Sequence, residues 1–146
     1  MKGELAGSKA AIELACDGCK KRGAKRAVLL PVSAPFHCSL MKPAAEAMEE
    51  ALGLVKVMAP AVPLYANVSA EPCEDAEKIV AQLVEQVTAM VRWRESIANM
   101  AAAGADEFVE VGGKVLGPMV KRIAPDVKVI SVVTIEDVEA AAKEIA

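Results

Sequence analysis

The chain has 146 residues, enough for one domain with a buried core. Apolar residues make up 54% of it, which excludes a disordered polypeptide, and aromatic residues make up only 3%, so the core must be aliphatic. The net charge of -3, without any basic stripe, argues against nucleic acid as a partner.

The sequence also bears on the compartment. No apolar run reaches the roughly 18 residues that a membrane span needs. The N-terminal segment carries Glu4, Lys9 and Glu13 within its apolar part, which argues against a signal peptide. Four cysteines are too few for a disulfide framework in a chain of this size. We therefore expect a cytoplasmic protein without a membrane partner.

The first part of the chain reads as helix, strand, loop, helix and strand. Residues 8–23 predict a helix that Gly23 ends, with an apolar face formed by Ile12, Ala15, Cys16 and Cys19. The apolar run 26–32 predicts a strand. Residues 39–55 predict a helix whose apolar face comprises Leu40, Ala44, Met48, Ala51 and Val55. Residues 61–68 predict a buried strand.

The remaining residues continue the alternation. Residues 74–87 predict an amphipathic helix with an apolar stripe of Ile79, Val80, Leu83, Val84 and Val87. A helix over 91–104, a strand over 106–113 and a helix over 114–123 follow, the last with a kink expected at Gly117-Pro118. The final strand is expected over 127–133, and the final helix over 134–146 with Thr134 as its N-cap.

This alternation predicts an α/β fold with largely parallel strand pairing. The N-terminal helix and strand cannot form a stable sheet by themselves. Either this piece packs on the rest as an appendage, or its partner strands are missing from the chain.

His37, in the segment PVSAPFHCSL, is the only histidine. A histidine acts as a general base when a nucleophile lies within hydrogen-bond reach and a third group orients the ring. No serine stands in a G-x-S-x-G turn; the serines are Ser8, Ser33, Ser39, Ser69, Ser96 and Ser131. The residues alone therefore leave two readings, a structural histidine or a base without its nucleophile.

Two further motifs favour structural roles. The C-x-x-C pair Cys16 and Cys19 could be a redox pair or half of a zinc site, but the remaining ligand candidates show no second paired spacing. Both cysteines fall on an apolar helical face, which predicts buried structural cysteines and no metal site. The VGGKV turn, 111–115, could offer amides to an anion, but it lacks a nucleotide fingerprint and reads as a tight turn.

Two spacings carry a family resemblance. The FH-x-x-LM-x-P cluster runs from Phe36 to Pro43, and the Q-x6-W spacing joins Gln86 to Trp93. Together they resemble the malonyl-CoA:acyl carrier protein transacylase family, and the likeness is collinear over nearly the whole chain. The resemblance implies the C-terminal part of an α/β-hydrolase-like acyltransferase core over 31–146. It also implies that 1–30 is the last helix and strand of a ferredoxin-like subdomain.

The resemblance also implies roles for individual residues. His37 corresponds to the base of a Ser–His dyad, and Gln86 to the glutamine whose main-chain carbonyl orients that histidine. Phe36 corresponds to the position where phenylalanine accompanies malonyl rather than methylmalonyl selection. The implied substrate is malonyl-CoA, the acceptor is the phosphopantetheine thiol of acyl carrier protein in fatty acid biosynthesis, and no cofactor or metal is implied.

The chain departs from the family pattern in ways that open alternatives. The serine elbow, the arginine that binds the malonyl carboxylate and the oxyanion glutamine all lie upstream of Met1 in the family, so we expect a truncated chain that is inactive alone. The family's V-G-P-G turn is shortened to 111–113. One alternative is a non-catalytic module that binds acyl carrier protein or a complementing N-terminal half. A weaker one is a thiol-redox or metal protein using Cys16 and Cys19. Exposed apolar edges would also favour self-association.

Overall fold

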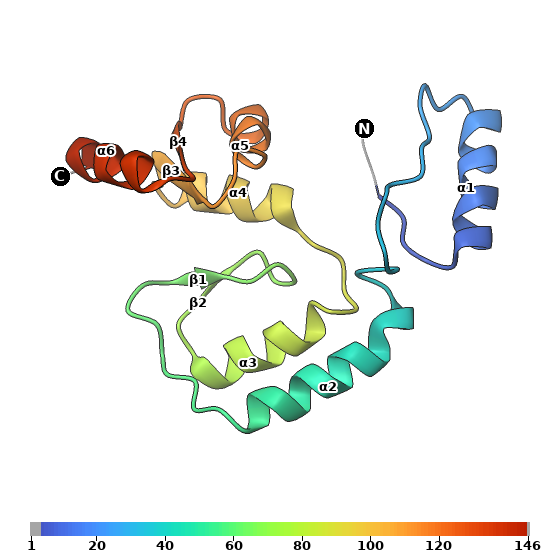
Figure 1. The fold of residues 1–146 in the computed structure, drawn as a ribbon, viewed down its shortest axis with the longest axis horizontal. Helices are drawn as coiled ribbons and strands as arrows, with labels where there is room; N and C mark the ends of the chain where they lie inside the picture. Colours follow the sequence, from blue (N-terminus) through green and yellow to red (C-terminus); the bar gives the residue numbers. More distant parts are fainter. Residues whose placement is uncertain (1–3, 146) are drawn as a thin grey trace. The chain divides into compact units, whose positions relative to one another are not determined.

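The computed structural model describes residues 4–145, which divide into two compact units. The first ends at Val91 and the second begins at Arg92. The first unit contains α1 (Lys9–Lys21), a 3-10 turn η1 (Ser39–Met41), α2 (Lys42–Gly53), β1 (Leu64–Tyr65), β2 (Pro72–Cys73) and α3 (Ala76–Glu85). The second contains α4 (Trp93–Ala102), β3 (Glu107–Val111), α5 (Gly117–Ile123), β4 (Lys128–Val132) and α6 (Ile135–Ile145). Figure 1 shows these elements in chain order.

Helix α1 confirms the first predicted helix. The hydroxyl of Ser8 accepts a hydrogen bond from the Ala11 amide, and Gly23 ends the helix with a φ of 87°. The predicted face is its less exposed face, but no residue of α1 is buried. The expectation that Cys16 and Cys19 are buried is therefore wrong, since both are only half-buried.

The strand predicted over 26–32 is absent. These residues have no strand partner, and Val28, Leu29 and Leu30 are 53%, 49% and 54% exposed. An apolar run becomes a strand only when a neighbouring backbone accepts and donates its hydrogen bonds, and no described segment lies in register beside it. The prediction of a strand here is therefore wrong, because the sheet that it requires is not formed.

Helices α2 and α3 lie side by side in the first unit (Figure 1). The predicted stripe of α3 is confirmed, with Ile79 buried, and Asp75 caps the helix by accepting from the Lys78 amide at 2.9 Å. The predicted face of α2 is wrong: its members are exposed, whereas Met41, Ala45 and Leu52 are half-buried. Because α2 carries apolar residues on several faces, spacing alone could not select the packed one.

The buried strand predicted over 61–68 shortens to Leu64–Tyr65, which pairs antiparallel with Pro72–Cys73. Leu64 is 37% exposed, so this strand is not buried. Between the two strands, Ala70 is fully buried and has a φ of 57°. Non-glycine residues adopt this left-handed conformation at a cost, so the packing around Ala70 holds the turn in a single conformation.

The second unit confirms the predicted parallel pairing. Strands β3 and β4 are parallel, from Glu107 opposite Lys128 to Val111 opposite Val132. Ile97 of α4, Val120 of α5 and Val127 form its buried core. Helices α5 and α6 contact β4, and α4 contacts α5. The pair of strands with its covering helices establishes an α/β fold.

The ends of the helices in this unit follow from local sequence. Thr134 caps α6 as predicted, because its hydroxyl accepts from the Asp137 amide at 3.2 Å. Gly104 has a φ of 101° just after α4. The kink expected at Gly117-Pro118 is wrong: these residues begin α5, where a proline in the first turn leaves no amide unpaired.

None of the described helices is long and apolar enough to cross a membrane. The boundary expected at residue 30, between a ferredoxin-like subdomain remnant and the acyltransferase core, stays a prediction.

Candidate active site

The loop before α2 holds His37 in an unusual backbone conformation. The Phe36 amide donates to the Ala34 carbonyl at 3.0 Å, and the Cys38 thiol donates to the Pro35 carbonyl at 3.1 Å. His37 itself has a φ of 59°, in the left-handed region that costs a non-glycine residue about 1–2 kcal/mol. The side chain is exposed. The loop thus exposes the imidazole of His37 from a turn that has a hydrogen bond at the residue before it and another at the residue after it.

The His37 ring meets the end of α3. Its Nδ1 lies 2.9 Å from the main-chain oxygen of Gln86, so the contact that the family resemblance implies between this ring and this carbonyl is present. The carbonyl accepts and the ring donates, which requires the hydrogen on Nδ1. No hydrogen bond joins Nε2 to any residue among 4–145. In this tautomer Nε2 carries the lone pair and can accept a proton.

Gln86 offers this carbonyl because α3 ends at Glu85. The Gln86 amide closes the last turn on the Gln82 carbonyl at 3.0 Å, and the amides of Thr88 and Ala89 then fold back to the Glu85 carbonyl. The carbonyls of a last helical turn lack intrahelical partners. The oxygen of Gln86 is therefore free to accept from a side chain outside the helix.

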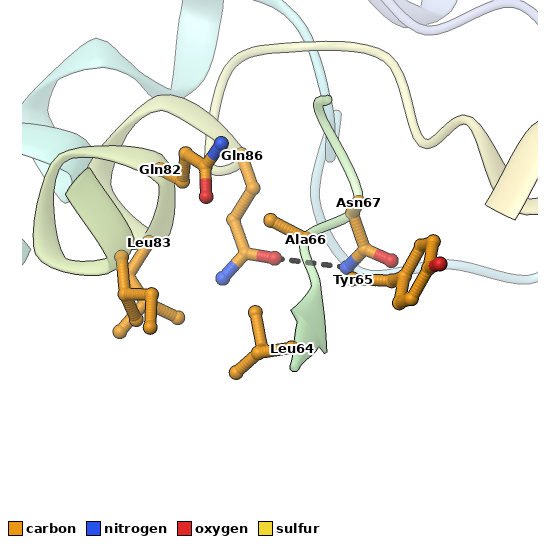
Figure 2. A pocket seen from close by; sticks show the side chains of 8 residues that line it. Leu64, Tyr65, Ala66, Asn67, Gln82, Leu83 and Gln86 are labelled. Atoms are coloured by element: carbon orange, nitrogen blue, oxygen red, sulfur yellow. Dashed lines mark hydrogen bonds between the residues drawn. The ribbon is translucent and has the colours of Figure 1, made fainter. Parts of the chain in front are cut away.

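The side chain of Gln86 makes a second contact that the sequence did not predict. Its Oε1 accepts from Nδ2 of Asn67 at 2.8 Å, across a hollow of about 200 Å³ between β1 and α3. Figure 2 shows Asn67 and Gln86 pointing toward one another, with Leu64 and Leu83 on the apolar side of the hollow. Asn67 lies in a stretch that the sequence reads as strand, and no spacing signalled its pairing with α3.

Phe36 and the cysteines complete the residues singled out from the sequence. Phe36 is 47% exposed beside His37, so its ring is available for contact with a ligand. All four cysteines are free. Among the described residues, no three His, Cys, Asp or Glu side chains come close enough together to hold a metal ion.

The main-chain amides that follow the glycine turn of the second unit bind a carboxylate of the chain itself, that of Glu110. Glu110 accepts from the amides of Val115, Leu116 and Gly117 at 2.8, 2.9 and 2.8 Å. The Leu116 amide contributes most to lowering the pKa of Glu110 below its ordinary value, with the Gly117 and Val115 amides and the Ser131 hydroxyl adding to it against partial desolvation. The chain bends at Gly112 and over 114–116, in agreement with the tight turn predicted from VGGKV, and Glu110 binds the Val115 amide within it.

Comparison with known proteins bears on what this arrangement does. No protein-family model matches the chain. Among curated relatives, malonyl CoA-acyl carrier protein transacylase of Bacillus subtilis (strain 168) is 41% identical over 138 residues, covering 94% of the chain and 44% of that protein. The chain is homologous to the C-terminal portion of malonyl CoA-acyl carrier protein transacylases.

Solved transacylase structures agree with this relationship. Acyl-carrier-protein-S-malonyltransferase from Bartonella henselae is 51% identical with a TM-score of 0.88, over 95% of the chain and 45% of that structure. A malonyl-transacylase solved in complex with a type II PKS acyl-carrier protein is 37% identical with a TM-score of 0.87, over 94% and 45%. These transacylases have an α/β acyltransferase fold, and the chain spans less than half of their length.

Proposed function

We propose that the chain supplies the general base for malonyl transfer from malonyl-CoA to the phosphopantetheine thiol of acyl carrier protein, in fatty acid biosynthesis in the cytoplasm. The observation that carries this proposal is the His37 ring, whose Nδ1 is bonded to the Gln86 carbonyl while Nε2 has no partner among residues 4–145. The homology to transacylases supports the substrate class. The solved complex of a related transacylase with its acyl carrier protein supports that protein as partner.

In the proposed reaction, Nε2 of His37 takes the proton of a serine hydroxyl while the serine oxygen attacks the thioester carbonyl of malonyl-CoA. Coenzyme A leaves as a thiol, with the proton that His37 returns to its sulfur, and a malonyl-serine ester remains. His37 then takes the proton of the phosphopantetheine thiol as its sulfur attacks the ester, and passes that proton to the departing serine oxygen. The malonyl group has moved between two thioesters, and His37 has regained its starting state.

The nucleophile is assigned outside these 146 residues, because none of their serines stands in a G-x-S-x-G turn. On the resemblance to the transacylase family, we also assign the arginine for the malonyl carboxylate and the oxyanion donor outside these residues. The 146 residues alone would then form no malonyl ester, and the reaction calls for no cofactor beyond its thioester donor and its thiol acceptor.

Gln86 and Phe36 have supporting roles in this proposal. The Gln86 carbonyl holds the ring in the tautomer that leaves Nε2 free, the task that a carboxylate performs in a full triad. Phe36 stands next to the base and would lie beside the α-carbon of the malonyl group, where it disfavours an added methyl group.

A chimaera tests the proposal directly. The matching segment of the Bartonella henselae enzyme, 45% of its length, is replaced by this chain, and malonyl transfer from malonyl-CoA to acyl carrier protein is followed by the mass of the acyl carrier protein. We expect transfer that is lost when His37 is replaced. The 146-residue chain alone serves as a second arm, in which we expect no malonyl adduct on any serine.

The alternative is a non-catalytic module that binds acyl carrier protein or a complementing N-terminal half. Transfer by the chimaera that does not depend on His37 would favour this module over the catalytic proposal. So would tight binding of acyl carrier protein by a chimaera that transfers nothing.

A further inference from the structure

We propose that Asn67 is a positioning residue for His37 and acts through the side chain of Gln86. The inference rests on the proposed function, since it concerns how the base of that reaction is held. Asn67 touches neither ring nitrogen of His37, so its effect must pass through Gln86.

Gln86 connects the two residues through two different oxygens. Its side-chain Oε1 accepts from Asn67 Nδ2 at 2.8 Å, and its main-chain oxygen accepts from His37 Nδ1 at 2.9 Å. The close view shows the Asn67 and Gln86 amides meeting across the hollow between β1 and α3 (Figure 2). One residue thus receives a hydrogen bond from each side, and its rotation would disturb both.

Gln86 needs this support because of its place in the chain. It follows the last residue of α3, where helices fray and open at low cost in free energy. Its amide donates to the Gln82 carbonyl at 3.0 Å, and the Val87 amide, in the same peptide plane as the Gln86 carbonyl, donates to the Val84 carbonyl at 3.2 Å. Without Asn67, only these hydrogen bonds of the frayed helix end and the contact with His37 set the direction of the Gln86 carbonyl.

Asn67 can give this support because its turn is rigid. The turn closes through a hydrogen bond of 3.0 Å from the Ala70 amide to the Ala66 carbonyl. Ala70 is fully buried in a left-handed conformation, which persists only where the surroundings determine it. Asn67 itself is half-buried, which shields its bond to Gln86 from competing water. The side-chain amide of Asn67 is therefore a fixed donor that can hold the side chain of Gln86 in one orientation.

The tautomer of the His37 ring reports on this chain of contacts without any activity assay. His37 is the only histidine, so the imidazole nitrogens of the full 146-residue chain give one unambiguous set of signals in long-range ¹H–¹⁵N NMR spectra. We expect the hydrogen on Nδ1 in the parent chain, because a carbonyl can only accept. In N67A we expect a mixture with the Nε2–H tautomer.

A second substitution separates positioning from general damage to the fold. Gln86→Ala removes the side-chain oxygen but keeps the main-chain carbonyl, so it should shift the tautomer as N67A does. The double variant should shift it no further, because both changes break the same hydrogen bond. Asn99→Ala, at an exposed position of α4 in the second unit, is the matched control and should leave the tautomer unchanged.

Each outcome decides the inference. An Nδ1–H ring that persists in N67A, or effects of N67A and Q86A that add, would overturn it. If N67A does not fold, Q86A decides alone, and an unchanged ring in Q86A overturns the inference. A parent ring with its hydrogen on Nε2 would overturn both the inference and the orientation of the base. A chimaera without transfer whose ring keeps Nδ1–H would reject the proposed function only.

Discussion

The Nδ1 atom of His37 lies 2.9 Å from the main-chain oxygen of Gln86, although 49 residues separate them along the chain. No described carboxylate forms an ion pair or a hydrogen bond with this ring. A neutral carbonyl at a helix end therefore orients the imidazole, and the acceptor adds no charge beside it.

Replacing the base tests its chemical role apart from its structural one. His37→Asn in the chimaera should lower malonyl transfer by about 10²–10⁴-fold, the contribution of a general base. Asparagine adopts the left-handed backbone of this position readily, and the ring is exposed. The free energy of unfolding should therefore change by less than about 0.5 kcal/mol, measured by urea denaturation. A variant that transfers malonyl at the parent rate would remove His37 from the mechanism.

Phe36 should restrict the acyl group. In the chimaera, Phe36→Ser should raise the use of methylmalonyl-CoA relative to malonyl-CoA by about 10–200-fold, since space for one methyl group is worth about 1–3 kcal/mol. Phe36→Leu keeps most of the bulk and should stay near the parent ratio. Competition between the two thioesters, read by mass spectrometry of the acyl carrier protein, measures the ratio. If the parent chimaera, Phe36→Ser and Phe36→Leu all used methylmalonyl-CoA and malonyl-CoA in the same ratio, Phe36 would be excluded from acyl selection.

Glu110 should make the stability of the chain depend on pH. Its folded pKa is lowered below the ordinary 4.5, chiefly by the Leu116 amide, so the unfolded chain binds the proton more tightly. The stabilisation is complete above the unfolded pKa and is lost as pH falls through the folded pKa. Glu110→Gln should lower the urea midpoint at neutral pH and flatten its fall below pH 4.5. Glu139→Gln, on an exposed position of α6, should keep the parent profile.

The start of α5 should tolerate no side chain at Gly117. A Cβ there would lie 3.0 Å from Val129 Cγ1 and 3.4 Å from Glu110 Oε2, so Gly117→Ala should lower the free energy of unfolding by about 1–3 kcal/mol. Gly18→Ala is the matched control, because no atom lies within 4 Å of its Cβ position inside α1. It should raise helicity, since alanine favours a helix interior over glycine by about 1 kcal/mol. Circular dichroism during denaturation measures both.

The exposed apolar segment 26–32 should promote self-association. It exposes Val28 and Leu30 by 53% and 54% without a strand partner, a surface that pairs readily with another chain. Sedimentation of the chain should show a mass that rises with concentration, and Leu30→Lys should reduce it. Leu54→Lys, at a site 84% exposed beyond α2, controls for added charge alone. A single monomeric species at every concentration would contradict this expectation.

The sequence by itself determined the elements whose signals are local. The cap at Thr134 and the glycine at 23 mark helix ends through short-range hydrogen bonds and backbone freedom, and both act as expected. The apolar stripe of α3 and the parallel strands of the second unit were equally readable. The residue pattern around His37 and Gln86 also sufficed to indicate the family, because two specific spacings occur together.

Only the tertiary structure decided what depends on neighbours distant in sequence. The run 26–32 forms no strand because a strand requires a partner backbone, and the packed face of α2 depends on where α3 lies. Likewise, the pairing of Asn67 with Gln86 follows from the way β1 and its turn meet the end of α3. The nest of amides around Glu110 arises where α5 begins over β3 and β4. Hydrogen bonds of this kind join separate elements, and no local pattern encodes which donor finds which acceptor.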